Sequence, residues 1–202
     1  MRLVLYVGVL ILGYAGVYAQ DYSKLVPLPG NLGVQNGLTY CPPNIITSIL
    51  GTPCTLKPDC SPVTNPKVKR LLVTGKVGHI TLYGLKPAIE AAVRALVNVQ
   101  KEKPDLFKAL GYSGMLCCRL IRGSSTSPSN HSWGTAIDFN INGKLDPRGD
   151  GKTQQGMLEL YPYFNKEGFY WGGGFSSASE DSMHFEVAEQ TLRRWQSEGK
   201  FD

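Results

Sequence analysis

The chain has 202 residues, of which 42% are hydrophobic and 18% are charged, so it can bury one substantial core. Its 23 glycines and 13 prolines predict many turns but stay below the excess that is typical of disordered low-complexity chains. The formal net charge of +5 comes from scattered basic residues without a Lys/Arg run, which argues against nucleic acid as a partner. We therefore expect a single globular domain that works as a monomer.

The first twenty residues have the pattern of an export signal. Residues 3–20 carry no charge, are rich in Leu, Val and Ile, and end with the small-residue pattern Val17-Tyr18-Ala19 of a signal-peptidase site. An uncleaved membrane anchor is the alternative, because 18 uncharged residues reach the lower limit for a membrane span. Three glycines dilute the hydrophobicity, so we expect cleavage, a secreted protein, and no membrane contact afterwards.

Export would place the five cysteines in an oxidising compartment, where disulfides are expected. Cys54 and Cys60 lie in a Pro-rich segment and could close a small loop, whereas adjacent Cys117 and Cys118 cannot easily pair with each other. Because the number is odd, one cysteine must stay unpaired or join another chain. A four-cysteine zinc site is disfavoured, since CxxC pairs are absent.

Residues 20–66 contain eight prolines and little periodicity, which predicts an irregular arm tied down by disulfides. After this arm we expect strands at 71–73 and 79–83, a helix from Pro87 to about Lys101, a short helix at 105–110 and a strand at 115–121 that ends in Arg122. A loop at 123–130, a strand at 135–141 and a loop at 143–152 should follow. The last expected elements are a helix through Met157 and Phe164 that Pro162 shortens or bends, strands at 169–171 and 183–187, and an amphipathic helix at 188–198.

This order lacks regular βαβ alternation, so we predict an α+β fold with a mainly antiparallel sheet packed by helices. The corresponding organisation is a signal peptide at 1–19, a Pro/Cys-rich arm at 20–66, and one domain at 67–202.

Two of the three histidines lie in settings that suggest metal chemistry. His131 precedes Asp138 by seven residues, joined through small residues, and Asp181 precedes His184 by three. Two imidazole nitrogens and one carboxylate oxygen, with a fourth position for water, are the ligand set of a catalytic zinc site. Either half alone is more often a surface pair or a satisfied core group, but Asp138 lies among apolar residues and needs a compensating cation or several hydrogen bonds.

Three segments carry a family resemblance: Ser129-Asn-His-Ser-Trp-Gly-Thr-Ala-Ile-Asp138, Trp171-Gly-Gly173 and Asp181-Ser-Met-His-Phe-Glu186. The pattern resembles the M15 family of zinc peptidases, which includes D-Ala-D-Ala carboxypeptidases and L-alanyl-D-glutamate endopeptidases acting on peptidoglycan. The resemblance extends over about residues 85–187 and implies the sheet-and-helix fold shared with the hedgehog signalling domain. The arm before Pro66 lies outside the pattern.

The resemblance also implies roles for single residues. It implies zinc held by His131, Asp138 and His184, with Asp181 as the general base and Arg122 in contact with the substrate carbonyl or carboxylate. The carboxypeptidases often carry Glu at the position of Asp181, so the shorter side chain favours the endopeptidase branch. The expected substrate is therefore a peptidoglycan stem peptide or muropeptide.

Some alternatives remain open at this level. Glu186 lies two residues beyond His184 on the same strand face, so it could hold an imidazole nitrogen or serve as a surface ion-pair partner. The chain could also be a zinc-containing binding module without hydrolysis, although a module that only binds needs no base at position 181. A third alternative is a structural or inhibitory protein whose arm covers the cleft.

Overall fold

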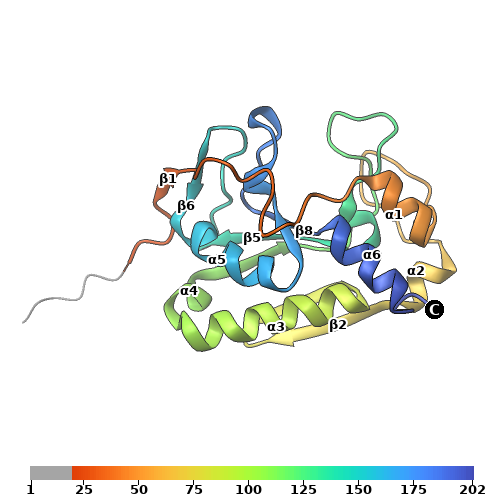
Figure 1. Cartoon of the computed structure of the whole chain (residues 1–202), viewed down its shortest axis with the longest axis horizontal. Helices are drawn as coiled ribbons and strands as arrows, with labels where there is room; N and C mark the ends of the chain where they lie inside the picture. The colour runs from red at the N-terminus through yellow and green to blue at the C-terminus, as the bar shows by residue number, and fades with distance from the viewer. Residues whose placement is uncertain (1–19) are drawn as a thin grey trace, which may run out of the picture.

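The computed structural model describes residues 20–202, so the predicted signal segment lies outside the described residues (Figure 1). The fold is mixed α+β, and the strand pairs of all three sheets are antiparallel, as predicted. Among the helices of the described chain, none is long and apolar enough to cross a membrane.

A four-stranded sheet with the order β4-β5-β8-β7 forms the centre of the molecule. Its strands are β4 (Leu110–Gly114), β5 (Ala136–Ile141), β7 (Phe169–Trp171) and β8 (His184–Val187). A separate hairpin joins β2 (Leu72–Val77) to β3 (Ile80–Leu85), and a third, two-stranded sheet pairs β1 (Leu25–Pro27) with β6 (Lys152–Gln154).

The helices pack between and around these sheets (Figure 1). The long helix α3 (Lys86–Glu102) lies along the β2–β3 hairpin and also contacts α4 (Pro104–Ala109) and α5 (Gln155–Lys166). Its buried face is mostly alanine and aliphatic residues at helical spacing, which explains why the sequence pattern predicted it well. α5 runs through Pro162 without being shortened, and α6 (Glu189–Ser197) closes the chain.

The predicted strand at residues 115–121 is wrong. The strand β4 begins five residues earlier, at the end of the short helix that was expected at 105–110. Residues 115–121 form only isolated bridges, from Cys118 to Ser61 and from Leu120 to Pro128. The apolar composition of this segment reflects burial of Met115 and Cys118 rather than ladder pairing, so Arg122 lies in a turn and not at a strand end.

The arm is more ordered than predicted. It contains β1 and the helix α1 (Pro43–Leu50), and its last residue begins the helix α2 (Pro66–Arg70). The sequence analysis missed both helices, each of which has a proline at its start. The arm crosses the molecule from β1 at one end to α1 at the other (Figure 1). Apolar side chains of the arm belong to the same buried cluster as those of the central sheet and α3, namely Tyr22, Cys41, Ile46, Ile49, Leu50, Cys54 and Val63.

Two disulfides join the arm to the segment before the first candidate ligand. Cys54 bonds to Cys118 and Cys60 bonds to Cys117, so the small Cys54–Cys60 loop considered above does not form. The adjacent cysteines point to two different partners, in agreement with the expectation that they cannot pair with each other. Cys41 is the free thiol of the described chain, and it is buried.

The two disulfides close nearly the same loop of the unfolded chain, with sequence separations of 64 and 57 residues. Replacing either pair by alanine should lower the free energy of unfolding by about 2–3 kcal/mol. The remaining disulfide keeps the large loop closed, so the substitution releases only a loop of roughly ten residues. Removing both pairs should cost about 7 kcal/mol, more than the sum of the single losses. Urea unfolding of the three variants measures this, and equal, additive losses would contradict it.

Candidate metal and catalytic site

The register of the central sheet brings two candidate ligands face to face. Asp138 of β5 is the cross-strand partner of His184 of β8, and the next pair on the same face of the sheet is Ala136 with Glu186. Directly opposed residues on antiparallel strands have Cβ atoms about 5 Å apart. The Oδ1 atom of Asp138 consequently lies 3.0 Å from Nδ1 of His184.

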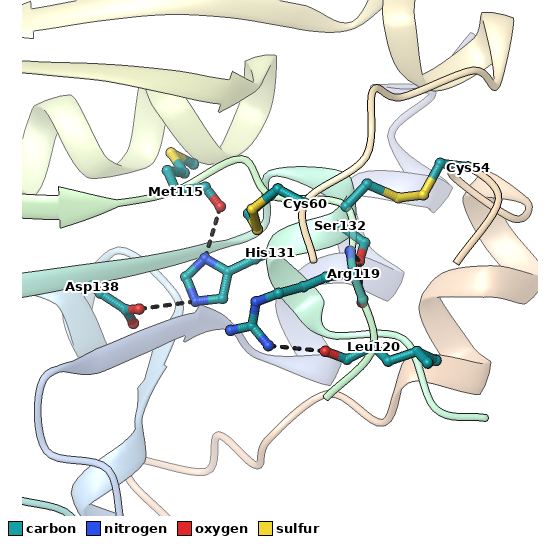
Figure 2. Close-up of a disulfide and its surroundings, with 10 residues drawn as sticks. Cys54, Cys60, Met115, Arg119, Leu120, His131, Ser132 and Asp138 are labelled. Atoms are coloured by element: carbon teal, nitrogen blue, oxygen red, sulfur yellow. Dashed lines mark hydrogen bonds and ion pairs between the residues drawn. A yellow bond between two sulfur atoms is a disulfide. The ribbon is translucent and has the colours of Figure 1, made fainter. Parts of the chain in front are cut away.

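The third candidate ligand comes from a short 3-10 helix, η1 (Asn130–Trp133), which precedes β5. Gly134 ends it in the left-handed conformation with φ of 67°. A Cβ atom on Gly134 would lie 2.7 Å from the Cα atom of Gly84, so the turn needs glycine for both its dihedral angle and its contact with β3. This turn returns the chain so that His131 faces Asp138 across the site (Figure 2).

These three residues form a compact donor set. Ligand atoms of His131, Asp138 and His184 all lie within 4.8 Å of one another. The Nε2 atom of His131 lies 3.3 Å from Oδ2 of Asp138 and 3.3 Å from Nδ1 of His184. The arrangement could hold a metal ion, with two nitrogens and one oxygen as donors.

The outer contacts of both imidazoles leave the inward nitrogens free to bind a metal. Nδ1 of His131 donates to the carbonyl of Met115 at 2.7 Å, which leaves Nε2 as the lone-pair nitrogen (Figure 2). Nε2 of His184 lies 3.1 Å from Oε2 of Glu186, which leaves Nδ1 for the ion. A carbonyl or carboxylate behind a ligating histidine is the usual way to set its tautomer. The donor set therefore fits zinc, and Glu186 holds an imidazole nitrogen rather than a surface cation.

The charges and hydrogen bonds of the candidate ligands shift the pKa values of Asp138 and His184. Burial alone raises the pKa of Asp138, but the charges and hydrogen bonds of His131 and His184 outweigh it and hold the pKa well below its usual range. Burial lowers the pKa of His184, yet hydrogen bonds to Asp138 and Glu186 reverse this and raise it to about 10. A metal ion must therefore displace a proton from His184.

Asp181 lies in the turn that leads into β8. Its carbonyl accepts the backbone N–H of His184 at 3.0 Å, and its side-chain Oδ2 lies 3.1 Å from Nε of Arg148. The side chain is 14% exposed, and its Oδ1 has no hydrogen-bond partner within residues 20–202. Burial raises the pKa of Asp181, while the charges of His184 and Arg148 lower it in part.

Arg122 is exposed and lies at the edge of the site, in a turn. A second guanidinium, missed by the sequence analysis, lies deeper: Arg119 is half-buried and extends from the disulfide-bonded segment towards His131 (Figure 2). Burial lowers the pKa of Arg119, and the charge of Arg122 lowers it further. Within the described chain neither arginine forms an ion pair with a carboxylate. The adjacent cysteines Cys117 and Cys118 were the available signal that the backbone is anchored next to Arg119.

Two pockets meet at the candidate metal site, and both are lined by Arg119, Arg122, His131 and Asp138. The first, of about 210 Å³, extends towards Phe175 and Asp181. The second, of about 470 Å³, extends in another direction, towards Cys60 and Leu116. The site therefore lies in a cleft that continues on both sides of the donor set.

The arm forms part of this site, which nothing in its composition indicated. Tyr40 and Cys41 line the first pocket, and Tyr40 packs edge-on against Phe175 with ring centroids 6.2 Å apart. The backbone N–H of Cys41 donates to Oε1 of Glu186 at 2.8 Å, and its carbonyl accepts from the side chain of Asn130. Burial and the charge of Glu186 raise the pKa of the Cys41 thiol to about 12, so it stays protonated.

The contact between Glu186 and His184 generates a prediction. In the Glu186→Gln variant the side-chain amide can donate to Nε2 of His184, which favours the tautomer with a proton on Nδ1. We expect the affinity for zinc to fall tenfold to a hundredfold. Competition with a chelator measures the affinity, and the exposed Glu198→Gln variant is the control. Unchanged affinity in Glu186→Gln would show that Glu186 does not orient the imidazole.

Comparison with known families agrees with this geometry. The family model Peptidase_M15_4, described as D-alanyl-D-alanine carboxypeptidase, matches residues 122–187. The matched segment contains Arg122, His131, Asp138, Asp181 and His184, whereas Arg119 and the arm precede it. A search of curated proteins finds no match. Residues 122–187 thus match the M15 peptidase family model, which confirms the resemblance identified from the sequence.

Proposed function

We propose that the protein is a secreted zinc metallopeptidase that hydrolyses peptidoglycan stem peptides. The observation that carries this proposal is the donor set of His131, Asp138 and His184, whose outward nitrogens are already occupied and whose inward atoms meet in a two-sided cleft. In this proposal residues 1–19 are a signal peptide, residues 20–66 form an arm, and residues 67–202 form the peptidase domain. The two disulfides agree with an oxidising compartment.

His131, Asp138 and His184 would hold the zinc ion. When bound, zinc supplies Lewis-acid chemistry, polarising the scissile carbonyl and acidifying a water molecule. The buried neighbours of the imidazoles, Met115 and Glu186, keep both rings oriented for this task.

Asp181 is suited to act as the base because its carboxylate lines the same pocket without being part of the donor set. One of its oxygens is free of hydrogen bonds within the described residues, so it can accept a proton from water. Burial raises its pKa, which makes the carboxylate a stronger base towards that water.

Arg122 and Arg119 would stabilise negative charge on the substrate. Both guanidiniums line the pockets on either side of the donor set. A charge-assisted hydrogen bond to the developing oxyanion is worth about 3 kcal/mol in comparable sites. Arg119 is better placed to remain fixed, since it is half-buried and its NH1 also donates to the carbonyl of Leu120 at 2.9 Å.

We favour cleavage within the stem peptide, between L-Ala and D-Glu, over release of terminal D-Ala. In both reactions the residue after the scissile bond carries a carboxylate that the arginines could bind. The arginines therefore do not distinguish the two reactions. The two-sided cleft supports the endopeptidase, because such an enzyme must accommodate peptide on both sides of the bond. Aspartate rather than glutamate at position 181 supports the same choice.

A non-catalytic binding module on the same fold is the alternative. The position of Asp181 beside the donor set argues against it. The arm contributes Tyr40 and Cys41 to the pocket wall, which supports a role in building the cleft rather than in blocking it.

The first experiment separates metal binding from catalysis. The purified protein should contain about one zinc per chain, and the His131→Ala, His184→Ala double variant should lose it. Asp181→Ala should keep zinc and fold while losing about 10²- to 10⁴-fold in kcat, because only the proton acceptor is removed. Elemental analysis and steady-state hydrolysis of muropeptides measure both. Zinc retained by the double variant, or a near wild-type rate in Asp181→Ala, would refute the assignment.

The second experiment identifies the bond. A stem tripeptide without D-Ala-D-Ala should be hydrolysed between L-Ala and D-Glu, and mass spectrometry should detect both products. If the tripeptide is inert and a pentapeptide releases D-Ala, the enzyme is a carboxypeptidase. A protein that binds zinc but hydrolyses neither peptide would support the binding module.

A further inference from the structure

The loop between β5 and α5 contains buried oxygen atoms that the proposed peptidase function does not use. Asp146 is 2% exposed and Gln154 is 3% exposed. Oδ1 of Asp146 and Oε1 of Gln154 are two of the buried side-chain atoms without a hydrogen-bond partner in the part of the chain that is described. The two residues are neighbours, because the backbone N–H of Gln154 donates to Oδ2 of Asp146. Buried unpaired acceptors are costly and require a partner.

Negative charge accumulates at the same place. Glu180 is 2% exposed, and its carboxylate accepts from the backbone N–H of Gly149 at 2.9 Å and from Ser182 at 2.6 Å. Burial raises the pKa of Asp146 to about 7, and the charges of Glu180 and Asp150 raise it as well. Within residues 20–202 no basic side chain forms an ion pair with any of these three carboxylates. The cluster lacks a cation.

The spacing of the loop matches much of a known calcium-binding pattern. In the 12-residue EF-hand loop, oxygen ligands come from positions 1, 3, 5, 7, 9 and 12, and position 6 is glycine. Counting Asp146 as the first position places Asp150 at the fifth, Gly151 at the sixth and Gln154 at the ninth. Gly151 has a φ of 70°, the left-handed conformation that a sharp turn requires.

Two positions depart from this pattern, and the structure offers a substitute for one of them. The third position is Arg148, which points to Asp181 instead, and the twelfth is Met157, which is buried in the core. Glu180 provides a carboxylate from a different segment, and the backbone N–H of Gly149, shared between the carboxylate and the carbonyl of Glu180, holds it against the loop. Asp146, Asp150 and Glu180 do not all place a carboxylate oxygen within 4.8 Å of one another, so a calcium ion with Ca–O distances of about 2.3–2.6 Å would draw these side chains closer together.

We propose that Asp146, Asp150, Gln154 and Glu180, with backbone carbonyls of the loop, form a binding site for one calcium ion. All the donors are oxygen atoms, which suits a hard cation and not zinc. Bound calcium would pair the two orphan acceptors and neutralise the buried carboxylates. It would also stiffen the loop that carries Arg148, the partner of Asp181.

Calorimetric titration of Ca²⁺ into the zinc-loaded, disulfide-bonded protein tests the proposal. We expect one calcium per chain with a dissociation constant of about 10⁻⁴–10⁻³ M, the range of weak extracellular sites. Asp150→Asn should weaken binding at least tenfold, and Asp146→Asn should abolish it. Asp150 is exposed, so its variant keeps the measurement interpretable if Asp146→Asn does not fold. Asp202→Asn, at the exposed C-terminus, should bind calcium like the wild type.

Two further arms distinguish the site from its alternatives. The His131→Ala, His184→Ala variant should still bind calcium, which separates this site from the zinc site and from the proposed peptidase function. No uptake at about 10 mM Ca²⁺, tenfold above the weakest extracellular sites, would overturn the proposal. Uptake that is unchanged in both Asp146→Asn and Asp150→Asn would overturn it too. An Asp146 carboxyl that titrates identically with and without calcium would show that a proton, and not a metal ion, neutralises it.

Discussion

The site depends on the register between β5 and β8. With Asp138 opposite His184, the carboxylate and the imidazole meet at 3.0 Å, and Glu186 falls on the same strand face behind the imidazole. A slip of one residue would turn every side chain of β8 to the other face of the sheet. The register is held because Phe185 and Ile137 are completely buried on the opposite face, so a slip would also expose the core. Hydrophobic burial on one face thereby sets metal-binding geometry on the other.

The part of the site outside the family segment is organised by the disulfides and the arm. Cys117 and Cys118 tie the segment before η1 to the arm, and Arg119 follows directly after them. The backbone of Cys41 holds Glu186 from the other side. Residues that precede the matched segment thus support its ligands through covalent bonds and backbone hydrogen bonds, neither of which requires a recognisable motif.

The sequence predicted the features that depend on local patterns and missed those that depend on contacts between distant segments. The helix at 87–101, the strands at 135–141 and 169–171, and the His131, Asp138 and His184 set were recognisable because periodicity and motif spacing are local properties. The strand at 115–121 was placed wrongly because burial and disulfide bonding give an apolar segment that resembles a strand. The cysteine pairing, Arg119 and Tyr40 depend on contacts between distant segments, which one sequence does not encode in any local pattern.

The surroundings of Asp181 balance two opposing effects, and the balance bears on the proposed base. Burial disfavours the charged carboxylate and raises its pKa, whereas Arg148 at 3.1 Å and His184 stabilise the charge. A carboxylate too strongly stabilised would be a poor proton acceptor, and one too strongly buried would already be protonated at neutral pH. Arg148 lies in the loop at residues 143–151. The next residue of that loop, Gly149, donates its backbone N–H to Glu180, which directly precedes Asp181. The loop and the proposed base are therefore linked by these hydrogen bonds and by the ion pair of Arg148, so the pKa of Asp181 depends on where the loop holds Arg148.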